Sequence, residues 1–253
     1  MSIDKNKSKA ASLFDGWNEA LIWSCLQGHM GNMIYDDDEN PASAIIDIGD
    51  FCFFAGNPNA DLLSIIGEGK LLIPKDPFWE KLIEDYYGKR VNKSLRYAIK
   101  KEPNIFDVEK LTAYINKLNN YYELKLFDQN IFEMAQNEAW SADLCSQFKN
   151  YADYHRRAMG VAILHQGKLV SGASPYALYN GGIEIEIDTR PDYREKGLAT
   201  VCGAKLILEC LERNIYPSWD AHDLRSVGLA EKLGYHLDRP YVTYELTAQK
   251  VKV

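Results

Sequence analysis

The sequence predicts a folded α/β (α+β) protein with two domains, one over residues 1–120 and one over residues 121–253. Its hydrophobic fraction of 46% and charged fraction of 26% are those of an ordinary globular protein. Apolar residues recur with period two in some segments and with helical period in others, so strands and helices alternate along the chain. The paired residues Asn119 and Asn120 end a predicted helix just before a new strand and mark the expected boundary.

In the first domain, apolar residues at helical spacing predict an amphipathic helix over residues 9–27. Asp76 and Pro77 have the residue types of an N-cap and a first helical position, so we expect a helix over residues 77–87. This domain has no recognisable catalytic constellation. Its other expected segments are strands at 33–35, 44–48, 51–54, 70–73 and 94–99, and helices at 62–66 and 107–118.

In the second domain, strands and helices follow in a regular order. Gln166 and Gly167 separate two apolar runs by two residues, which predicts a β-hairpin. The helix expected over 197–213 is apolar over most of its circumference, as a helix packed deeply on a sheet should be. The expected order β-α-α-β-β-β-α-β-α-β is given by segments 122–127, 128–138, 148–157, 161–165, 168–173, 182–189, 197–213, 216–219, 224–233 and 241–246.

Residues 182–200 combine a strand, a short polar turn and the start of the long helix. The strand alternates isoleucine with Glu184, Glu186 and Asp188, so the isoleucines lie on one face and the carboxylates on the other. The helix start predicts a phosphate or pyrophosphate cradle, because unpaired N–H groups there favour an anion and Gly197 lets it approach closely. A plain strand-to-helix connection has the same spacing, and spacing alone leaves both interpretations open.

The pattern Arg194-x-x-Gly197-x-Ala199 resembles the acetyl-CoA signature of the GNAT acetyltransferases. Residues 217–235 resemble the second motif of that superfamily, a strand followed by a helix that ends in glycine and an aromatic residue. The resemblance covers about the last half of the chain. It extends more weakly into the first half, where the chain resembles a Firmicutes branch with an extra N-terminal domain. Some members of that branch resemble the zwittermicin A self-resistance protein.

This resemblance implies a GNAT fold with a mixed, mainly antiparallel central sheet flanked by helices, beside an N-terminal α+β domain. It also implies acetyl-CoA as cosubstrate and transfer of the acetyl group to a primary amine by direct attack. The backbone of Ile187, Asp188 and Thr189 would then pair with the pantetheine arm like an added strand. Residues that would hold the pyrophosphate are Arg194, Glu195, Lys196, Gly197, Leu198, Ala199 and Thr200. Asp223, which stands where many relatives have Asn, and Ser226 would lie near the pantetheine.

Glu184 and Glu186 are the candidate general bases. The attacking amine must be neutral, so a nearby group has to accept its proton. Together with Asp188, these carboxylates on a partly buried face would raise one another's pKa towards neutrality. A solvent-facing or salt-bridged strand is the alternative interpretation of either glutamate taken singly, and His222 is an alternative base.

The general acid is not evident from the sequence. Many relatives have a tyrosine that protonates the departing thiolate, and that position holds Ala230 here. Tyr235 and Tyr241 are close in the sequence. Either the acid is different, or water acts, or the protein binds acetyl-CoA without turnover. A catalytically idle sensor or assembly module is therefore the alternative to an N-acetyltransferase, and the paired glutamates favour the enzyme.

The net charge of −7 argues against a general nucleic-acid binder, whose binding surface would be basic. No apolar run approaches the roughly 20 residues of a membrane span. No apolar segment follows the basic N-terminal residues as it does in a signal peptide, so we expect a cytoplasmic protein. The five cysteines are scattered and form no CxxC pair, which predicts buried thiols in a reducing compartment.

The histidines lack partners at metal-ligand spacing, so no metal is expected. The expected partners are acetyl-CoA and a small amine-containing acceptor. The acidic positions 184, 186 and 188 suggest that this acceptor is cationic. The sequence leaves the identity of the acceptor and the oligomeric state open.

Overall fold

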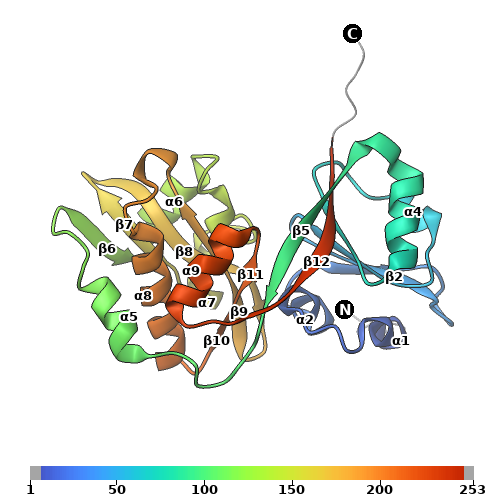
Figure 1. The fold of residues 1–253 in the computed structure, drawn as a ribbon, viewed down its shortest axis with the longest axis horizontal. Coiled ribbons are helices and arrows are strands. Elements are labelled where there is room, and N and C mark those ends of the chain that lie inside the picture. The colour runs from blue at the N-terminus through green and yellow to red at the C-terminus, as the bar shows by residue number, and fades with distance from the viewer. Residues whose placement is uncertain (1–6, 248–253) are drawn as a thin grey trace, which may run out of the picture. The chain divides into compact units, whose positions relative to one another are not determined.

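The computed structural model describes residues 7–247 and divides into two compact units. The chain up to Arg96, together with the chain from Pro240 onward, forms unit 1, and Tyr97–Arg239 forms unit 2. This division falls ahead of the expected boundary at 120/121. Helix α5 (Val108–Ile115) packs on α8 (Leu198–Glu212) of unit 2, and Figure 1 shows the two helices side by side.

The single helix predicted over residues 9–27 is wrong. The chain there forms α1 (Lys7–Ala11), the 3-10 turn η1 (Ser12–Phe14) and α2 (Ala20–Leu26). Gly16 has a φ of 74°, which interrupts any helix, and the Glu19 side chain then caps α2 by accepting the N–H of Ala20. The apolar spacing continues across the break because α1 and α2 both bury apolar side chains.

The sheet of unit 1 has the order β1-β2-β3-β4-β12-β5. Its antiparallel pairs include β1–β2, β2–β3 and β4–β12, whereas β3 and β4 run parallel. The strands are β1 (Asn32–Tyr35), β2 (Ser43–Ile48), β3 (Phe51–Gly56), β4 (Leu71–Pro74), β5 (Val91–Ile99) and β12 (Leu237–Leu246).

Helix α4 (Pro77–Tyr87) confirms the prediction from Asp76 and Pro77. The Asp76 carboxylate accepts the backbone N–H groups of Phe78 and Trp79, as an N-cap does. Trp79 and Ile83 are fully buried in the core of unit 1. Shorter elements of this unit are α3 (Ala60–Ser64) and the 3-10 turn η2 (Gly88–Arg90).

The sheet of unit 2 has the order β10-β9-β8-β7-β6. Its neighbours are antiparallel except β9 and β10, which run parallel, so the prediction of a mixed, mainly antiparallel sheet is confirmed. The strands are β6 (Tyr122–Leu126), β7 (Val161–His165), β8 (Lys168–Tyr179), β9 (Gly182–Thr189) and β10 (Tyr216–Ser218). The predicted hairpin is also confirmed: Gln166 and Gly167 both have positive φ and join β7 to β8.

Helices cover both faces of this sheet. α8 packs on β7, β8 and β9, whereas the 3-10 turn η3 packs on β8 and β9, and α6 packs on β8. The helical elements are α6 (Gln129–Gln136), η3 (Ala142–Leu144), α7 (Tyr151–Arg157), η4 (Pro191–Tyr193), α8 and α9 (Leu224–Leu233). The helices expected over 197–213 and 224–233 are therefore present almost to the residue.

The last predicted strand differs from the expected order. Instead of completing the sheet of unit 2, β12 continues into unit 1, where Tyr244 and Glu245 pair with Leu72 and Leu71 of β4. All five cysteines are buried free thiols, as the sequence predicts. Within residues 7–247, none of the helices combines the length and the apolar character that crossing a bilayer requires.

Candidate functional site

Strand β9 of unit 2 loses one of its two neighbours partway along its length. β9 and β10 pair only from Gly182 opposite Tyr216 to Glu184 opposite Ser218. β10 ends there, and the chain turns away to form β11 (Asp220–Ala221), which pairs with β5. Within the described chain, residues 185–189 of β9 therefore keep β8 on one side and have no strand on the other. Such an open edge can take an extended ligand as an added strand.

The predicted alternation along β9 is confirmed by what covers each face. A methyl group placed on Gly203 of α8 would lie 3.0 Å from Cδ1 of Ile187, so the isoleucine face meets α8. On the opposite face, a methyl group on Gly172, the partner of Asp188, would lie 2.7 Å from Leu144 of η3. The carboxylates thus project towards η3.

Glu184 is buried at the paired end of β9, with an exposed fraction of 4%. A solvent-facing interpretation is therefore wrong for this residue. Burial, together with the nearby charges of Glu102 and Glu184, raises the pKa of Tyr216. Burial is also the main cause that raises the pKa of Tyr235 well above its ordinary value, and Glu184 contributes again. Glu184 thus lies close enough to the half-buried Tyr216 and the buried Tyr235 to affect the pKa of both.

Glu186 lies in the part of β9 that β10 no longer covers. It is half-buried and pairs across the sheet with Ser174, whose hydroxyl is 2.8 Å from the hydroxyl of Tyr154. Of the two glutamates, Glu186 is the one with access to solvent from the open half of the strand.

The pKa of Asp188 is raised, but by a different neighbour from the one that the sequence predicts. Burial and the charge of Asp143 raise the pKa of the Asp188 carboxyl to about 6, while Arg194 acts in the opposite direction. The carboxylate that perturbs Asp188 therefore comes from η3 and not from β9. Sequence reasoning missed Asp143 because η3 lies in a stretch without a periodic pattern. The backbone carbonyl of Asp188 accepts a hydrogen bond of 3.1 Å from Ser171, whose hydroxyl also lies 2.8 Å from that of Thr189.

The start of α8 has no side-chain cap in the described structure. Its N-cap is Gly197, with a φ of 79°, and Glu195 also has a positive φ of 63°. By contrast, α4, α5, α6, α7 and α9 each begin with an Asp or Asn side chain that accepts a backbone N–H. The N–H groups of Leu198, Ala199 and Thr200 belong to the first turn, which has no intrahelical acceptor, so they are available to an anion.

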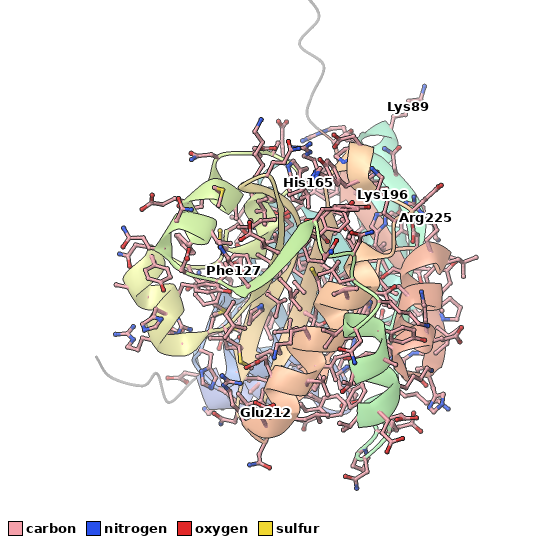
Figure 2. The ribbon with its side chains drawn as sticks, turned by 90° about the vertical axis from the view of Figure 1, so that its left-hand side faces the viewer. Lys89, Phe127, His165, Lys196, Glu212 and Arg225 are labelled. Atoms are coloured by element: carbon pink, nitrogen blue, oxygen red, sulfur yellow. The ribbon has the colours of Figure 1, made fainter. Side chains whose placement is uncertain are left out.

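The basic residues beside this helix start hold the turn together. Arg194 donates from Nε to the carbonyl of Thr189 at 3.3 Å, and Lys196 donates to the carbonyl of Asp192 at 2.9 Å. Lys196 Nζ also lies 4.4 Å from the centre of the Tyr193 ring. Figure 2 shows Lys196 at one end of α8 and Glu212 at the other. Positive charge is thus concentrated at the helix end where anions are favoured.

A pocket of about 210 Å³ adjoins this helix start. Its walls come from α5 and the turn after it, from β6, from the first turn of α8, and from Lys232 near the end of α9. Sequence reasoning found the α8 part and missed the rest. Lys117 lies in a segment with no motif, and Lys232 lies within the second motif at 217–235 but has no role assigned there.

The residues predicted from the second motif have structural partners. Asp223 caps α9 by accepting the N–H of Ser226 at 2.9 Å, and it also accepts two hydrogen bonds from Arg225. Burial opposes its ionisation, but these donors hold the pKa of Asp223 below its usual range. The Ser226 hydroxyl accepts a hydrogen bond of 3.1 Å from the indole of Trp219. His222 is exposed.

Tyr235 and Tyr241, the two tyrosines close to the second motif in the sequence, lie in different compact units. Ala230 is fully buried. Tyr235 is 1% exposed, and its hydroxyl donates a hydrogen bond of 2.6 Å to the carbonyl of Pro217. Tyr241 belongs to unit 1. Among residues 7–247, no three His, Cys, Asp or Glu side chains gather as a metal site would require.

Residues 11–244 match the family model described as GNAT acetyltransferase. A crystal structure of a GCN5-related N-acetyltransferase-like protein from Streptococcus suis 89/1591 is 45% identical, with a TM-score of 0.93 over 96% of this chain and 99% of that one. An uncharacterized N-acetyltransferase, YdfB of Bacillus subtilis (strain 168), is 26% identical over 95% of both chains. A GCN5-related N-acetyltransferase from Kribbella flavida, 11% identical with a TM-score of 0.57 over 98% of both chains, shares the fold.

Proposed function

The chain belongs to the GNAT acetyltransferase family and is an acyltransferase, and we propose that it transfers the acetyl group of acetyl-CoA to a primary amine of a small acceptor by direct attack. One observation carries this proposal. The open edge of β9 leads through a short turn into the uncapped N-terminus of α8. An extended arm followed by a diphosphate, which is the shape of coenzyme A, fits that sequence of features.

The cosubstrate would be held mainly by backbone groups. We assign the pantetheine arm to the open edge at Ile187, Asp188 and Thr189, and the pyrophosphate to residues 194–200. Acetyl-CoA supplies the thioester that is cleaved. Asp223 and Ser226 remain proposed contacts near the pantetheine, and the internal partners of their side chains support an indirect role, in which they fix the start of α9.

We assign the general base to the pair Glu184 and Glu186. The base must accept a proton from the ammonium form of the acceptor before the nitrogen can attack the thioester carbon. The half-buried position of Glu186 supports it as the member that meets the acceptor. The buried position of Glu184, on the same face of β9, supports a role in holding negative charge near Glu186, which would raise the pKa of that base.

For the departing thiolate we propose protonation by water. Ala230 has no ionisable group, and the Tyr235 O–H is already donated to a backbone carbonyl. No protein side chain of the described part is therefore assigned as the acid.

We propose a cationic acceptor, a cytoplasmic location and membership of the branch with an extra N-terminal domain. Glu184, Glu186 and Asp188 lie on one face of β9, with Asp143 beside Asp188, and such a group of carboxylates favours an ammonium substrate. The presence of unit 1, in addition to the unit that holds the proposed site, supports the branch assignment. We place the transferase chemistry in the predicted domain 121–253, within its part that belongs to unit 2.

The test is release of free CoA from acetyl-CoA in the presence of a panel of amines. Wild type should release CoA with at least one cationic amine, and Glu186→Gln should lose most of that activity. Glu123→Gln changes an exposed glutamate on β6 and is the matched control. A protein that binds CoA in calorimetry but releases none with any amine would be a sensor or assembly module instead.

A further inference from the structure

The turn that joins β9 to α8 holds its shape mainly through contacts within itself. Glu195 has a positive φ of 63° although it carries a side chain, so its backbone conformation is unfavourable unless neighbouring contacts hold it. The Asp192 carboxylate accepts two hydrogen bonds of 2.8 Å from Arg190, and the Asp192 carbonyl accepts one from Lys196. These contacts close the turn on itself but do not fasten it to the sheet.

One side-chain hydrogen bond fastens the turn to a different hairpin. The Tyr193 hydroxyl lies 2.6 Å from Nδ1 of His165, the last residue of β7, and either group can be the donor. Among residues 7–247, this is the only hydrogen bond that links residues 191–196 to a segment other than the turn itself and β9. Figure 2 shows His165 and Lys196 at this end of α8. The middle of the turn therefore has a single polar anchor outside β9.

The anchoring imidazole is itself held by its surroundings. His165 is half-buried at the end of a strand that pairs with β6 on one side and with β8 on the other. The ring centres of Tyr122 and Tyr121 lie 5.3 and 5.6 Å from that of the imidazole. A residue on a paired strand is a firmer reference point than a loop residue, because strands are the more rigid elements.

The Tyr193 ring connects this anchor to the basic residues of the turn. Arg190 Cζ lies 4.6 Å and Lys196 Nζ 4.4 Å from the centre of the ring, close enough for cation–π attraction. Lys196 immediately precedes Gly197, the N-cap of α8. A fixed ring therefore also fixes an ammonium group beside the backbone N–H groups that are available to an anion.

We propose that His165 is a positioning residue for the cosubstrate. Through its hydrogen bond to Tyr193 it holds turn 190–197 in the shape that receives the pyrophosphate, and it does not itself contact the ligand. A preformed turn spares the ligand the loss of entropy on ordering it. The proposal rests on the proposed function, since it takes the pyrophosphate to lie at residues 194–200. His165 belongs to neither of the sequence motifs that carry the family resemblance.

Tyr193→Phe is the sharpest variant, because it keeps the ring and its contacts with Arg190 and Lys196 but removes the hydroxyl. Calorimetry should show that it binds CoA about fivefold more weakly than wild type, which corresponds to the loss of one hydrogen bond. Steady-state kinetics should show a matching rise in the KM for acetyl-CoA with kcat nearly unchanged. Tyr151→Phe, the matched control, removes a hydroxyl 3.4 Å from Nδ1 of His155 on α7 and should bind CoA as wild type does.

Variants of His165 test whether the effect passes through this hydrogen bond. In a His165→Ala background, Tyr193→Phe should change the affinity for CoA by less than about twofold, because the partner of the hydroxyl is already absent. His165→Asn, whose amide carries a polar atom close to the position of Nδ1, should restore most of the affinity that His165→Ala loses. Denaturation of the same preparations shows which variants are folded, and if His165→Ala is not, Tyr193→Phe and its control still decide.

Wild-type affinity for CoA in Tyr193→Phe would overturn this inference and leave the proposed function intact, even if denaturation showed a lower stability. So would an equal loss of affinity in Tyr151→Phe, or additive losses when the His165 and Tyr193 substitutions are combined. A wild-type protein that binds no CoA would overturn both proposals.

Discussion

Glu184 is the last residue of β9 that pairs with β10, and its partner is Ser218. Beyond this pair the two strands separate, because the chain after Ser218 turns to pair with β5. The pair therefore divides β9 into a closed, buried half and an open half. This division distinguishes two glutamates that the sequence pattern treats alike.

We expect Glu186→Gln to lower kcat by about 100-fold or more, the range of general base catalysis, with the KM for acetyl-CoA nearly unchanged. The amide keeps the size of the side chain but cannot accept the proton. Steady-state kinetics at several pH values would measure the effect. A kcat within about twofold of the wild-type value would show that Glu186 is not the base, because a general base contributes far more than a factor of two.

Gly197→Ala should destabilise the fold by about 1–2 kcal/mol, because an L-residue at a φ of 79° is strained. No atom lies within 4 Å of the added methyl, so the cost would come from the backbone and not from a clash. Chemical denaturation would measure it. Gly228→Ala, on the exposed side of α9 with equal space around it, should instead stabilise by about 0.5–1 kcal/mol. Equal effects of the two substitutions would contradict this explanation.

Asp188→Asn should change stability in a pH-dependent way. In the folded protein the pKa of this carboxyl is raised from 3.8 to about 6, so the folded state holds the proton more tightly than the unfolded state does. The group therefore favours folding below about pH 4, and this advantage is lost as the pH rises through 6. The free energy of unfolding of the variant, relative to that of wild type, should rise by about 1 kcal/mol from pH 4 to pH 7.5, after allowance for the partial exposure of the side chain.

Denaturation of both proteins at those two pH values tests this expectation. Asp143→Asn should shift the pKa of Asp188 back towards 3.8, because it removes the neighbouring charge that contributes to the rise. A stability difference between Asp188→Asn and wild type that does not vary with pH would show that the carboxyl titrates normally.

Tyr235→Phe should lower stability by about 1–3 kcal/mol and leave kcat close to that of wild type. The substitution removes the O–H that donates to the carbonyl of Pro217 and leaves that buried acceptor unpaired. Denaturation and acetyl-transfer kinetics on the same preparation separate the two effects. A large loss of kcat in a stably folded variant would identify Tyr235 as the missing acid.

Much of the fold follows from local sequence. Asp76-Pro77, Gln166-Gly167 and Asp223 predict a helix start, a hairpin and a second helix start, and each depends only on neighbouring backbone geometry. Strand alternation in β9 likewise identifies which side chains share a face. These features are predictable because the cause lies within a few residues of the effect.

The remaining features depend on contacts between distant segments. Nothing local indicates that β12 pairs with β4, that Asp143 lies beside Asp188, or that Lys117 and Lys232 line one pocket. The break in the first helix was missed for another reason. A single Gly16 is tolerated in a helical pattern, and only its positive φ shows that the helix ends.

Amide hydrogen exchange of unit 2, resolved residue by residue with and without CoA, tests the central claim most directly. If coenzyme A lies along the open edge of β9 and against the start of α8, amides among residues 187–189 and 198–200 should exchange more slowly in its presence. Protection elsewhere, or no protection in these two segments at saturating CoA, would contradict the proposed site.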